Sequence, residues 1–231
     1  MKLLDVHTHT GLSQKRESQI VSVDIREVIE SGFEPQGPFT IGIHPWYIDE
    51  LVIDDAYEFV KEYISHDQCM AIGEAGLDRS IKTSLNEQLE VFERQIQMAK
   101  DHNIHSLMIH CVRAFPDVLN LIKKKNFKGS LIFHDYNGKP EMTAQLLRYN
   151  CFFSYGEKLF NENSGGFKSF SHIPNHRILL ESDDMNHKSI EDVYERAASL
   201  LKLKLESLHQ TILENAESAF GKSLDLTPHS K

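Results

Sequence analysis

The sequence predicts an α/β protein, a (β/α)8 TIM-like barrel with an abbreviated first βα unit. Three observations favour this fold class. Short apolar runs alternate with stretches of helical spacing, which is typical of a parallel sheet covered by helices. A chain of 231 residues with 40% hydrophobic content can bury the core of one barrel, so we expect residues 1–231 to form a single domain. Polar side chains follow several of the runs, where barrel enzymes carry their active sites.

The apolar runs are the predicted strands, and there are enough of them for a full barrel. They are Leu3 to His9, Ile20 to Val23, Phe39 to Ile43, Cys69 to Gly73, His105 to His110, Ser130 to His134, Cys151 to Tyr155 and Arg177 to Ser182. The segment Gly11 to Gln19, after the first run, is polar and too short for a proper helix. We therefore expect the first βα unit to be abbreviated.

The helices lie between these runs. The clearest is Leu85 to His102, because its apolar residues recur at helical spacing and Ser84 with Glu87 matches a capping box. Two more helices, residues 190–203 and 205–219, are expected near the end of the sequence, before a polar tail. This alternation completes the predicted barrel.

Composition limits the classes of partner and compartment. A formal net charge of −9 argues against a broad electrostatic footprint for nucleic acid, so a polyanion would have to be held locally by a metal or a small basic rim. The cysteines Cys69, Cys111 and Cys151 are odd in number, which suits a reducing cytosol without a disulfide framework. We expect neither a signal peptide nor a membrane-spanning helix, because the sequence turns polar at Asp5 and no apolar run approaches the length of a span, and we expect no obligate protein partner. The expected location is cytoplasmic.

The first predicted strand carries two histidines that point into one space. Residues two apart share a face of a strand, so Asp5, His7 and His9 are expected on one side, with Val6 and Thr8 on the other. Two imidazoles at a strand end form half of a divalent-metal site. Asp5 would then support the ligands from below. The alternative is a pair of hydrogen-bonded structural histidines.

Further metal-competent side chains follow the later strands: Glu74, His110, His134 and Asp183. Each alone could be a satisfied histidine or a solvated carboxylate. Together they would meet at the carboxyl-terminal mouth of a barrel. Mixed imidazole and carboxylate ligands suit zinc, manganese or iron better than calcium, and magnesium is also compatible. Because a divalent ion activates water and a pair stabilises both oxygens of a phosphoester, hydrolysis is the expected chemistry.

The order of these residues resembles that of the TatD-type metal-dependent hydrolases of the amidohydrolase superfamily. The resemblance covers nearly the whole chain, and its most specific part is a Gly-Glu-x-Gly-Leu-Asp string. The matching pieces are Asp5-Val6-His7-Thr8-His9, Gly42-Ile43-His44-Pro45, Gly73-Glu74-Ala75-Gly76-Leu77-Asp78, Ile109-His110, Phe133-His134-Asp135-Tyr136-Asn137-Gly138, Ser154-Tyr155-Gly156, Leu179-Leu180-Glu181-Ser182-Asp183 and Asn215.

The resemblance implies a particular assignment of ligands. Two divalent metal ions are expected, with Glu74 bridging them, His7 and His9 on one ion, and His110 and His134 on the other. Asp183 would ligate the first ion or hold the attacking water, so Glu74 and Asp183 are the expected catalytic residues. Zinc, manganese or magnesium could fill these sites.

The chain departs from the family where substrate would be held. The family usually has another histidine after His-Pro, whereas this chain has Trp46 and Tyr47. The usual arginine two residues after the strand-five histidine is replaced by Val112, with Arg113 following. After Asp183, the usual Ala-Pro is replaced by Asp184-Met185. The metals are therefore the firmer inference, and the substrate is open.

Several residues around the expected metals are candidates to bind substrate: His44, Trp46, Tyr47, Arg113, Tyr136 and Lys139. The histidine could meet a phosphate or only shape a turn. The aromatic side chains could stack on a base of single-stranded nucleic acid or anchor their loops. The positive side chains of Arg113 and Lys139 could neutralise substrate phosphates. Asp78 could equally cap a loop or touch substrate.

Three functions remain open from the sequence. The first is a TatD-like deoxyribonuclease that acts on DNA with a metal-activated water. The second is a phosphoesterase of small phosphorylated metabolites, as in the PHP family, which shares the Asp-x-His-Thr-His-Thr opening; the late Asp-x-His expected of that family is missing at Asp183-Asp184-Met185. The third is a metal-stabilised binding protein without catalysis.

Overall fold

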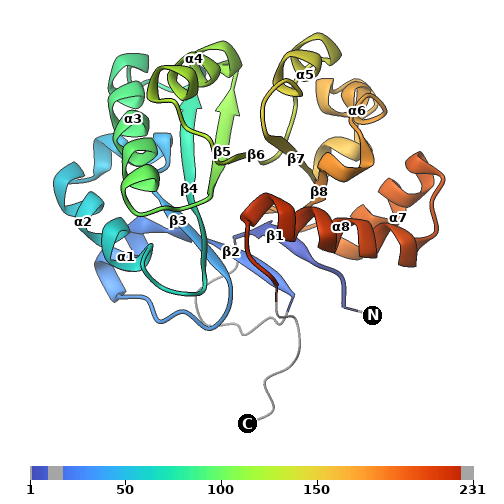
Figure 1. Cartoon of the computed structure of the whole chain (residues 1–231), viewed down its shortest axis with the longest axis horizontal. Helices are drawn as coiled ribbons and strands as arrows, with labels where there is room; N and C mark the ends of the chain where they lie inside the picture. The colour runs from blue at the N-terminus through green and yellow to red at the C-terminus, as the bar shows by residue number, and fades with distance from the viewer. Residues whose placement is uncertain (1, 10–17, 225–231) are drawn as a thin grey trace.

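The computed structural model describes residues 2–9 and 18–224. Its strands form one eight-stranded parallel sheet in which spatial order follows sequence order (Figure 1). The strands are β1 (Asp5–Thr8), β2 (Gln19–Asp24), β3 (Phe39–Gly42), β4 (Cys69–Asp78), β5 (Ser106–Val112), β6 (Ser130–Phe133), β7 (Cys151–Tyr155) and β8 (Ile178–Leu180). A parallel bridge from Thr8 to Asp183 brings the end of β8 back to β1, so the sheet curls into a nearly closed barrel. The predicted TIM-like barrel is confirmed.

Helices cover the outside of the sheet. They are α1 (Ile25–Ser31), α2 (Ile53–Tyr63), α3 (Leu85–Asp101), α4 (Phe115–Lys125), α5 (Pro140–Leu146), α6 (Gly165–Phe170), α7 (Ile190–Leu201) and α8 (Leu205–Phe220), with 3-10 turns η1 (Pro45–Glu50), η2 (Glu157–Phe160) and η3 (Asn175–Arg177). The capping box of Ser84 and Glu87 at the start of α3 is confirmed. The abbreviated unit expected between the first two strands falls largely on residues 10–17, outside the described residues. In the described part of the chain, we find no helix with the length and apolarity needed to cross a membrane.

One end of the barrel is filled with apolar side chains. The interior cluster contains Leu4, Val6, Ile20, Met70, Met108, Ile132, Phe152 and Leu179, and α8 adds Ala216, Ala219 and Phe220. Polar contacts hold α8 there: Ser106 Oγ, at the start of β5, donates to the carbonyl of Ala219 at 2.6 Å. Helix α8 therefore closes the amino-terminal end of the barrel, and only the carboxyl-terminal end is left for a polar site.

Strands β4 and β5 run further than the sequence predicted. We expected them to end at Gly73 and His110, but their pairing continues to Asp78 opposite Val112. Outward-facing Ala75 and Leu77 are fully buried against the helices, which keeps this polar stretch in the sheet. Glu74 thus projects from within a strand rather than following one.

A bulge in β1 overturns the expected orientation of Asp5. The pairing places Asp5 opposite Gln19 and Thr8 opposite Val21, so three steps along β1 match two along β2. An extra residue in one strand shifts the alternation of side chains. Asp5 and Thr8 therefore reach the same hydroxyl, that of Ser182, at 2.6 and 3.0 Å. Asp5 does not share a face with His7.

We expect Asn215→Ala to lower the free energy of unfolding by about 1–3 kcal/mol, because it removes the donor of two carbonyls, of which that of Ile178 is buried. Asn215 Nδ2 donates to the carbonyls of Asn175 and Ile178, both at 2.7 Å, and so joins α8 to the segment entering β8. Urea denaturation measures the change. Gln210→Ala, at an exposed position of the same helix, is the control. Equal stability of the two variants would contradict this role.

Candidate metal centre

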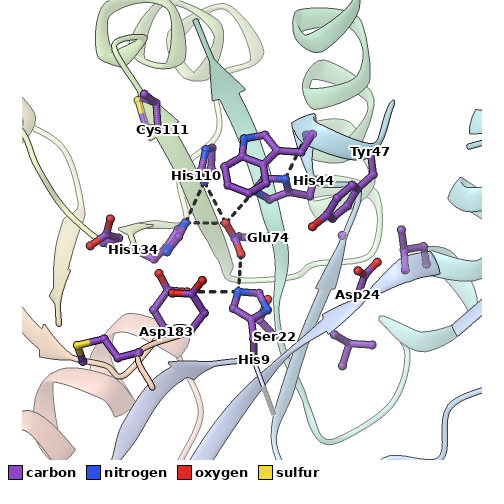
Figure 2. A pocket seen from close by; sticks show the side chains of 18 of the residues that line it. His9, Ser22, Asp24, His44, Tyr47, Glu74, His110, Cys111, His134 and Asp183 are labelled. Carbon is purple, nitrogen blue, oxygen red and sulfur yellow. Dashed lines mark hydrogen bonds and ion pairs between the residues drawn. The ribbon is translucent and has the colours of Figure 1, made fainter. Parts of the chain in front are cut away.

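The carboxylate of Glu74 is surrounded by five histidines from four parts of the barrel. Its Oε1 lies 3.0 Å from His44 Nε2, 3.1 Å from His110 Nδ1 and 2.6 Å from His134 Nε2. Its Oε2 lies 3.3 Å from His7 Nε2 and 3.2 Å from His9 Nε2. Figure 2 shows His9, His44, His110 and His134 pointing toward Glu74; His110 lies in β5, and the others follow β1, β3 and β6. One carboxylate therefore separates two groups of imidazoles.

Asp183 completes the group that contains His7 and His9. Its Oδ1 lies 3.6 Å from His7 Nε2 and 3.3 Å from His9 Nε2. Its backbone is fixed to β1, because the amide of Asp183 donates to the carbonyl of His7 and its carbonyl accepts from the amide of His9. The contact that closes the barrel therefore also assembles this half of the site.

The donor atoms of this cluster fit divalent cations. Four overlapping groups of three side chains hold their nitrogen and oxygen atoms within 4.8 Å of one another: His7, His9, Asp183; His7, Glu74, His134; His44, Glu74, His110; and His134, Glu181, Asp183. The buried Nε2 of His7 makes no hydrogen bond, although it lies 3.3 Å from Glu74 Oε2. Mixed imidazole and carboxylate donors of this kind suit zinc or manganese.

Protons balance the charge of the cluster when no cation is bound. Burial raises the pKa of Glu74, but the surrounding imidazoles outweigh it and hold that pKa well below its usual value. Burial lowers the pKa of His9, yet hydrogen bonds to Asp183 and Glu74 raise it to about 10. His134 responds in the same way, and the charge of Glu74 raises its pKa to about 10. A cation entering the site must displace these protons.

Comparison with known proteins agrees with this geometry. The family model of the TatD related DNases matches residues 5–221. The chain belongs to this family. An uncharacterised metal-dependent hydrolase of Bacillus subtilis, YabD, is 30% identical over 195 residues, covering 78% of this chain and 76% of that protein. A protein of Vairimorpha ceranae named "Putative deoxyribonuclease TATDN1 homolog" is 26% identical over 212 residues, covering 80% of this chain and 76% of that protein.

A solved structure supports the fold independently. The crystal structure of a hydrolase TatD family protein from Entamoeba histolytica superposes with a TM-score of 0.76 at 16% identity, covering 94% of this chain and 97% of that one. The chain is thus a TatD-family metal-dependent hydrolase with a barrel fold. All six ligand side chains predicted from the sequence, His7, His9, Glu74, His110, His134 and Asp183, lie in the cluster. Their role as ligands stays a prediction.

Two more buried carboxyl groups border the histidines of this TatD-family cluster: Asp5, and Glu181, which belongs to the group of His134 and Asp183. Asp5 accepts hydrogen bonds from the amide and hydroxyl of Ser182 at 3.0 and 2.6 Å, and so holds the residue before Asp183. Glu181 accepts from the amide of Asp135 at 2.5 Å, next to His134. Burial raises the pKa of Asp5 to about 7 and that of Glu181 to about 8. Asp5 therefore holds the backbone on both sides of this half of the site, since it also accepts from the amide of His7 at 3.3 Å.

Two buried glutamines of α3 position strand ends at the site. Gln95 accepts from the amide of Ile43 at 2.7 Å and donates to its carbonyl at 3.0 Å, immediately before His44. Gln88 makes the same pair of bonds with Asp78, at 2.7 and 3.0 Å. Our sequence reasoning missed both residues. Their signal was available: two glutamines seven positions apart on the apolar face of an amphipathic helix.

A cavity of about 580 Å³ opens above the cluster. His44, Trp46 and Tyr47 line it, as expected of substrate-binding residues. Trp46 is 51% exposed and its indole donates to Asp78 Oδ2 at 2.7 Å. The Arg26 guanidinium lies 3.3 Å from the centre of the Tyr47 ring. Both aromatic side chains are thus held in place at the wall of the cavity.

Three other substrate candidates lie elsewhere. Tyr136 is 1% exposed, its hydroxyl bonds to Thr143 Oγ1 at 2.8 Å, and it packs among core aromatic rings, so no surface is left for stacking on a base. Arg113 and Lys139 are exposed, outside the residues that line the cavity. Arg113 is carried away because β5 runs past His110 to Val112 before the chain turns. Stacking by Tyr136 is therefore corrected, whereas phosphate contact by Arg113 and Lys139, which lie outside the cavity lining, stays a prediction.

Lys158 is a cavity residue that the sequence did not single out. Among the described residues, it is the one lysine or arginine that lines the cavity, and it pairs with Asp135 at 2.7 Å. Its backbone is fixed, since Ser164 Oγ donates to the carbonyl of Lys158 at 3.1 Å. A lysine just after the Ser-Tyr-Gly that ends β7 was the available signal.

We expect apparent metal affinity to rise between about pH 6 and pH 8, by about tenfold per pH unit for each displaced proton. The pKa of about 10 at His9 and His134 means that both imidazoles carry protons in this range and must lose them to bind a cation. Calorimetric titration with zinc, in buffers of different ionisation enthalpy, measures affinity and proton release. An affinity that does not change with pH, without proton release, would contradict this charge balance.

Proposed function

We propose that this chain is a deoxyribonuclease that hydrolyses phosphodiester bonds of DNA with two divalent ions, zinc, manganese or magnesium. The observation that carries the proposal is the position of Glu74, whose two oxygens face two separate groups of ligand-type side chains. His7, His9 and Asp183 would hold one ion, His110 and His134 the other, and Glu74 both. His44, at 3.0 Å from Glu74 Oε1, is an additional candidate ligand or phosphate contact.

In this reaction the ions and Asp183 would act on the attacking water. The bound ions would neutralise the phosphoryl oxygens and activate water. Burial raises the pKa of Asp183, but its hydrogen bond with His9 and the charges of neighbouring imidazoles lower it to about 2, so the carboxylate is ionised at neutral pH. With its side chain 23% exposed at the cavity, the ionised Asp183 can accept a hydrogen bond from the attacking water and orient it.

The cavity wall supports a nucleotide as substrate. Trp46 and Tyr47 present fixed aromatic rings beside the histidine cluster, and stacking on a base does not depend on its identity. Lys158 can meet one phosphate oxygen. The deoxyribonuclease name carried by the relative in Vairimorpha ceranae agrees with this choice. We further propose a cytoplasmic location, which the free cysteines Cys69, Cys111 and Cys151 suit.

The charge of the cavity favours a second candidate, a phosphoesterase of small metabolites. Asp24, Glu27, Glu157 and Asp184 line the cavity besides the carboxylates of the cluster. Their charge disfavours the flanking phosphates of a long strand. Metal-loaded protein should therefore be assayed against single-stranded DNA and a panel of phosphomonoesters. Turnover of DNA supports the nuclease, turnover of phosphomonoesters alone supports the second candidate, and metal binding without turnover indicates a binding protein.

We expect Glu74→Gln to reduce metal-dependent hydrolysis by about 100- to 1,000-fold or more, because it removes the charge shared by both groups of ligands. Steady-state hydrolysis of single-stranded DNA measures the loss, with circular dichroism as the check on folding. Glu58→Gln, an exposed substitution on α2, serves as the control. A folded Glu74→Gln variant with normal turnover would refute the mechanism.

We expect Trp46→Ala to raise KM for single-stranded DNA by about 5- to 100-fold, which corresponds to the loss of one stacked base. The indole would contact a base and not the reacting phosphate. Its removal should therefore weaken substrate binding more than it slows the chemical step, so kcat should change less than KM. The matched control is Val52→Ala, at an exposed apolar position after η1. An unchanged KM would show that Trp46 does not contact the base.

A further inference from the structure

We propose that Asp78, held by Gln88, is a positioning residue that couples the metal centre to the substrate-binding wall of the cavity. It would do so by holding His110, a predicted ligand, and Trp46, a predicted substrate contact, with one carboxylate oxygen. The inference rests on the proposed function and adds to it a link between cation binding and the aromatic wall.

The carboxylate of Asp78 is buried and fully engaged. It is 1% exposed at the end of β4. Oδ2 accepts from Trp46 Nε1 at 2.7 Å and lies 3.3 Å from His110 Nε2. Oδ1 accepts from the amide and hydroxyl of Ser80 at 2.7 and 2.5 Å. With donors on both oxygens, the group cannot rotate without breaking several hydrogen bonds.

The backbone of Asp78 is held as firmly as its side chain. Gln88 bonds to both its amide and its carbonyl, and a second bond from Gln88 Nε2 reaches the carbonyl of Thr83 at 2.8 Å. The glutamine is 1% exposed and lies on α3, outside the barrel. Helix α3 therefore sets where the carboxylate stands relative to the cluster.

The contact between Asp78 and His110 decides which ring nitrogen of His110 faces the cluster. Nε2 points to Asp78, while Nδ1 lies 3.1 Å from Glu74 Oε1. A carboxylate on one nitrogen of an imidazole holds the proton there and leaves the lone pair of the other nitrogen for a metal. Asp78 therefore presents Nδ1 of His110 as the ligand atom.

For Trp46, the same oxygen sets the plane of the indole. The ring stands edge-on to His44 and His110, with centroid separations of 5.0 and 5.6 Å and interplanar angles of 85° and 75°. Trp46 and His110 both contact Asp78 Oδ2. Any shift of His110 on cation binding therefore changes the contacts of this oxygen and of the Trp46 ring. Trp46 is the only tryptophan of the chain, so its fluorescence reports this link directly.

The test is the isosteric substitution Asp78→Asn, followed by titration with zinc. An amide cannot accept hydrogen bonds on both of its polar atoms, so at least one of the donors around Asp78 loses its partner. We expect wild-type protein to bind zinc with a change in tryptophan emission. Asp78→Asn should weaken zinc binding by about 10- to 100-fold, as loss of a carboxylate behind a ligand histidine does, and should remove most of the emission change.

Two controls separate this link from general destabilisation. Ser84→Ala removes the cap of α3, the helix that carries Gln88, and should leave affinity and emission response as in wild type. Trp46→Phe supplies the fluorescence background. If Asp78→Asn does not fold, Gln88→Met keeps the carboxylate, frees its backbone and should reduce both readouts in the same direction.

The outcomes distinguish the two proposals. A folded Asp78→Asn or Gln88→Met variant with wild-type zinc affinity and a full emission change would overturn the coupling and leave the metal centre standing. Failure of wild-type protein to bind zinc, manganese or magnesium would instead overturn the metal centre on which the coupling rests.

Discussion

The structure depends on the burial of one carboxylate among imidazoles. Glu74 is only 6% exposed, and an ionised carboxylate in such a place is stable only when partners of opposite charge surround it. Histidines at or beyond the ends of β1, β3, β5 and β6 surround it at 2.6–3.3 Å, and His9 and His134, whose pKa is raised to about 10, supply the opposite charge. The barrel brings these strand ends to one mouth, and a cation can replace the protons that otherwise balance the charge.

The rest of the barrel keeps this arrangement in register. The bridge from Thr8 to Asp183 closes the sheet, and the amides and carbonyls around it tie His7 and His9 to Asp183. On the opposite side, Gln88 and Gln95 hold the ends of β4 and β3 through paired backbone hydrogen bonds. Stability and site geometry therefore share the same contacts, as expected where catalytic groups stand on rigid strands.

The cavity differs in character from the metal cluster below it. The cluster contains all six ligand residues that the resemblance to the family predicts, whereas the wall carries Trp46 and Tyr47, where the sequence departs from the pattern that it resembles. Carboxylates such as Asp24 and Asp184 surround the opening, and Lys158 is paired with Asp135. In the proposed function, a substrate would therefore be held by the ions and by aromatic contact more than by general attraction of a polyanion. Specificity is expected to come from this wall.

The eight strands, the capping box at Ser84 and the six predicted ligand residues could be inferred from local patterns, because alternation, caps and the polar ends of strands are local signals. The bulge in β1, which turns Asp5 toward Ser182, and the packing of Tyr136 in the core became visible only in the folded chain. It also placed Lys158 in the cavity and Gln88 on Asp78. These features depend on which residues meet across the barrel, and a local pattern, such as the two glutamines on one face of α3, does not identify the distant residue that it contacts.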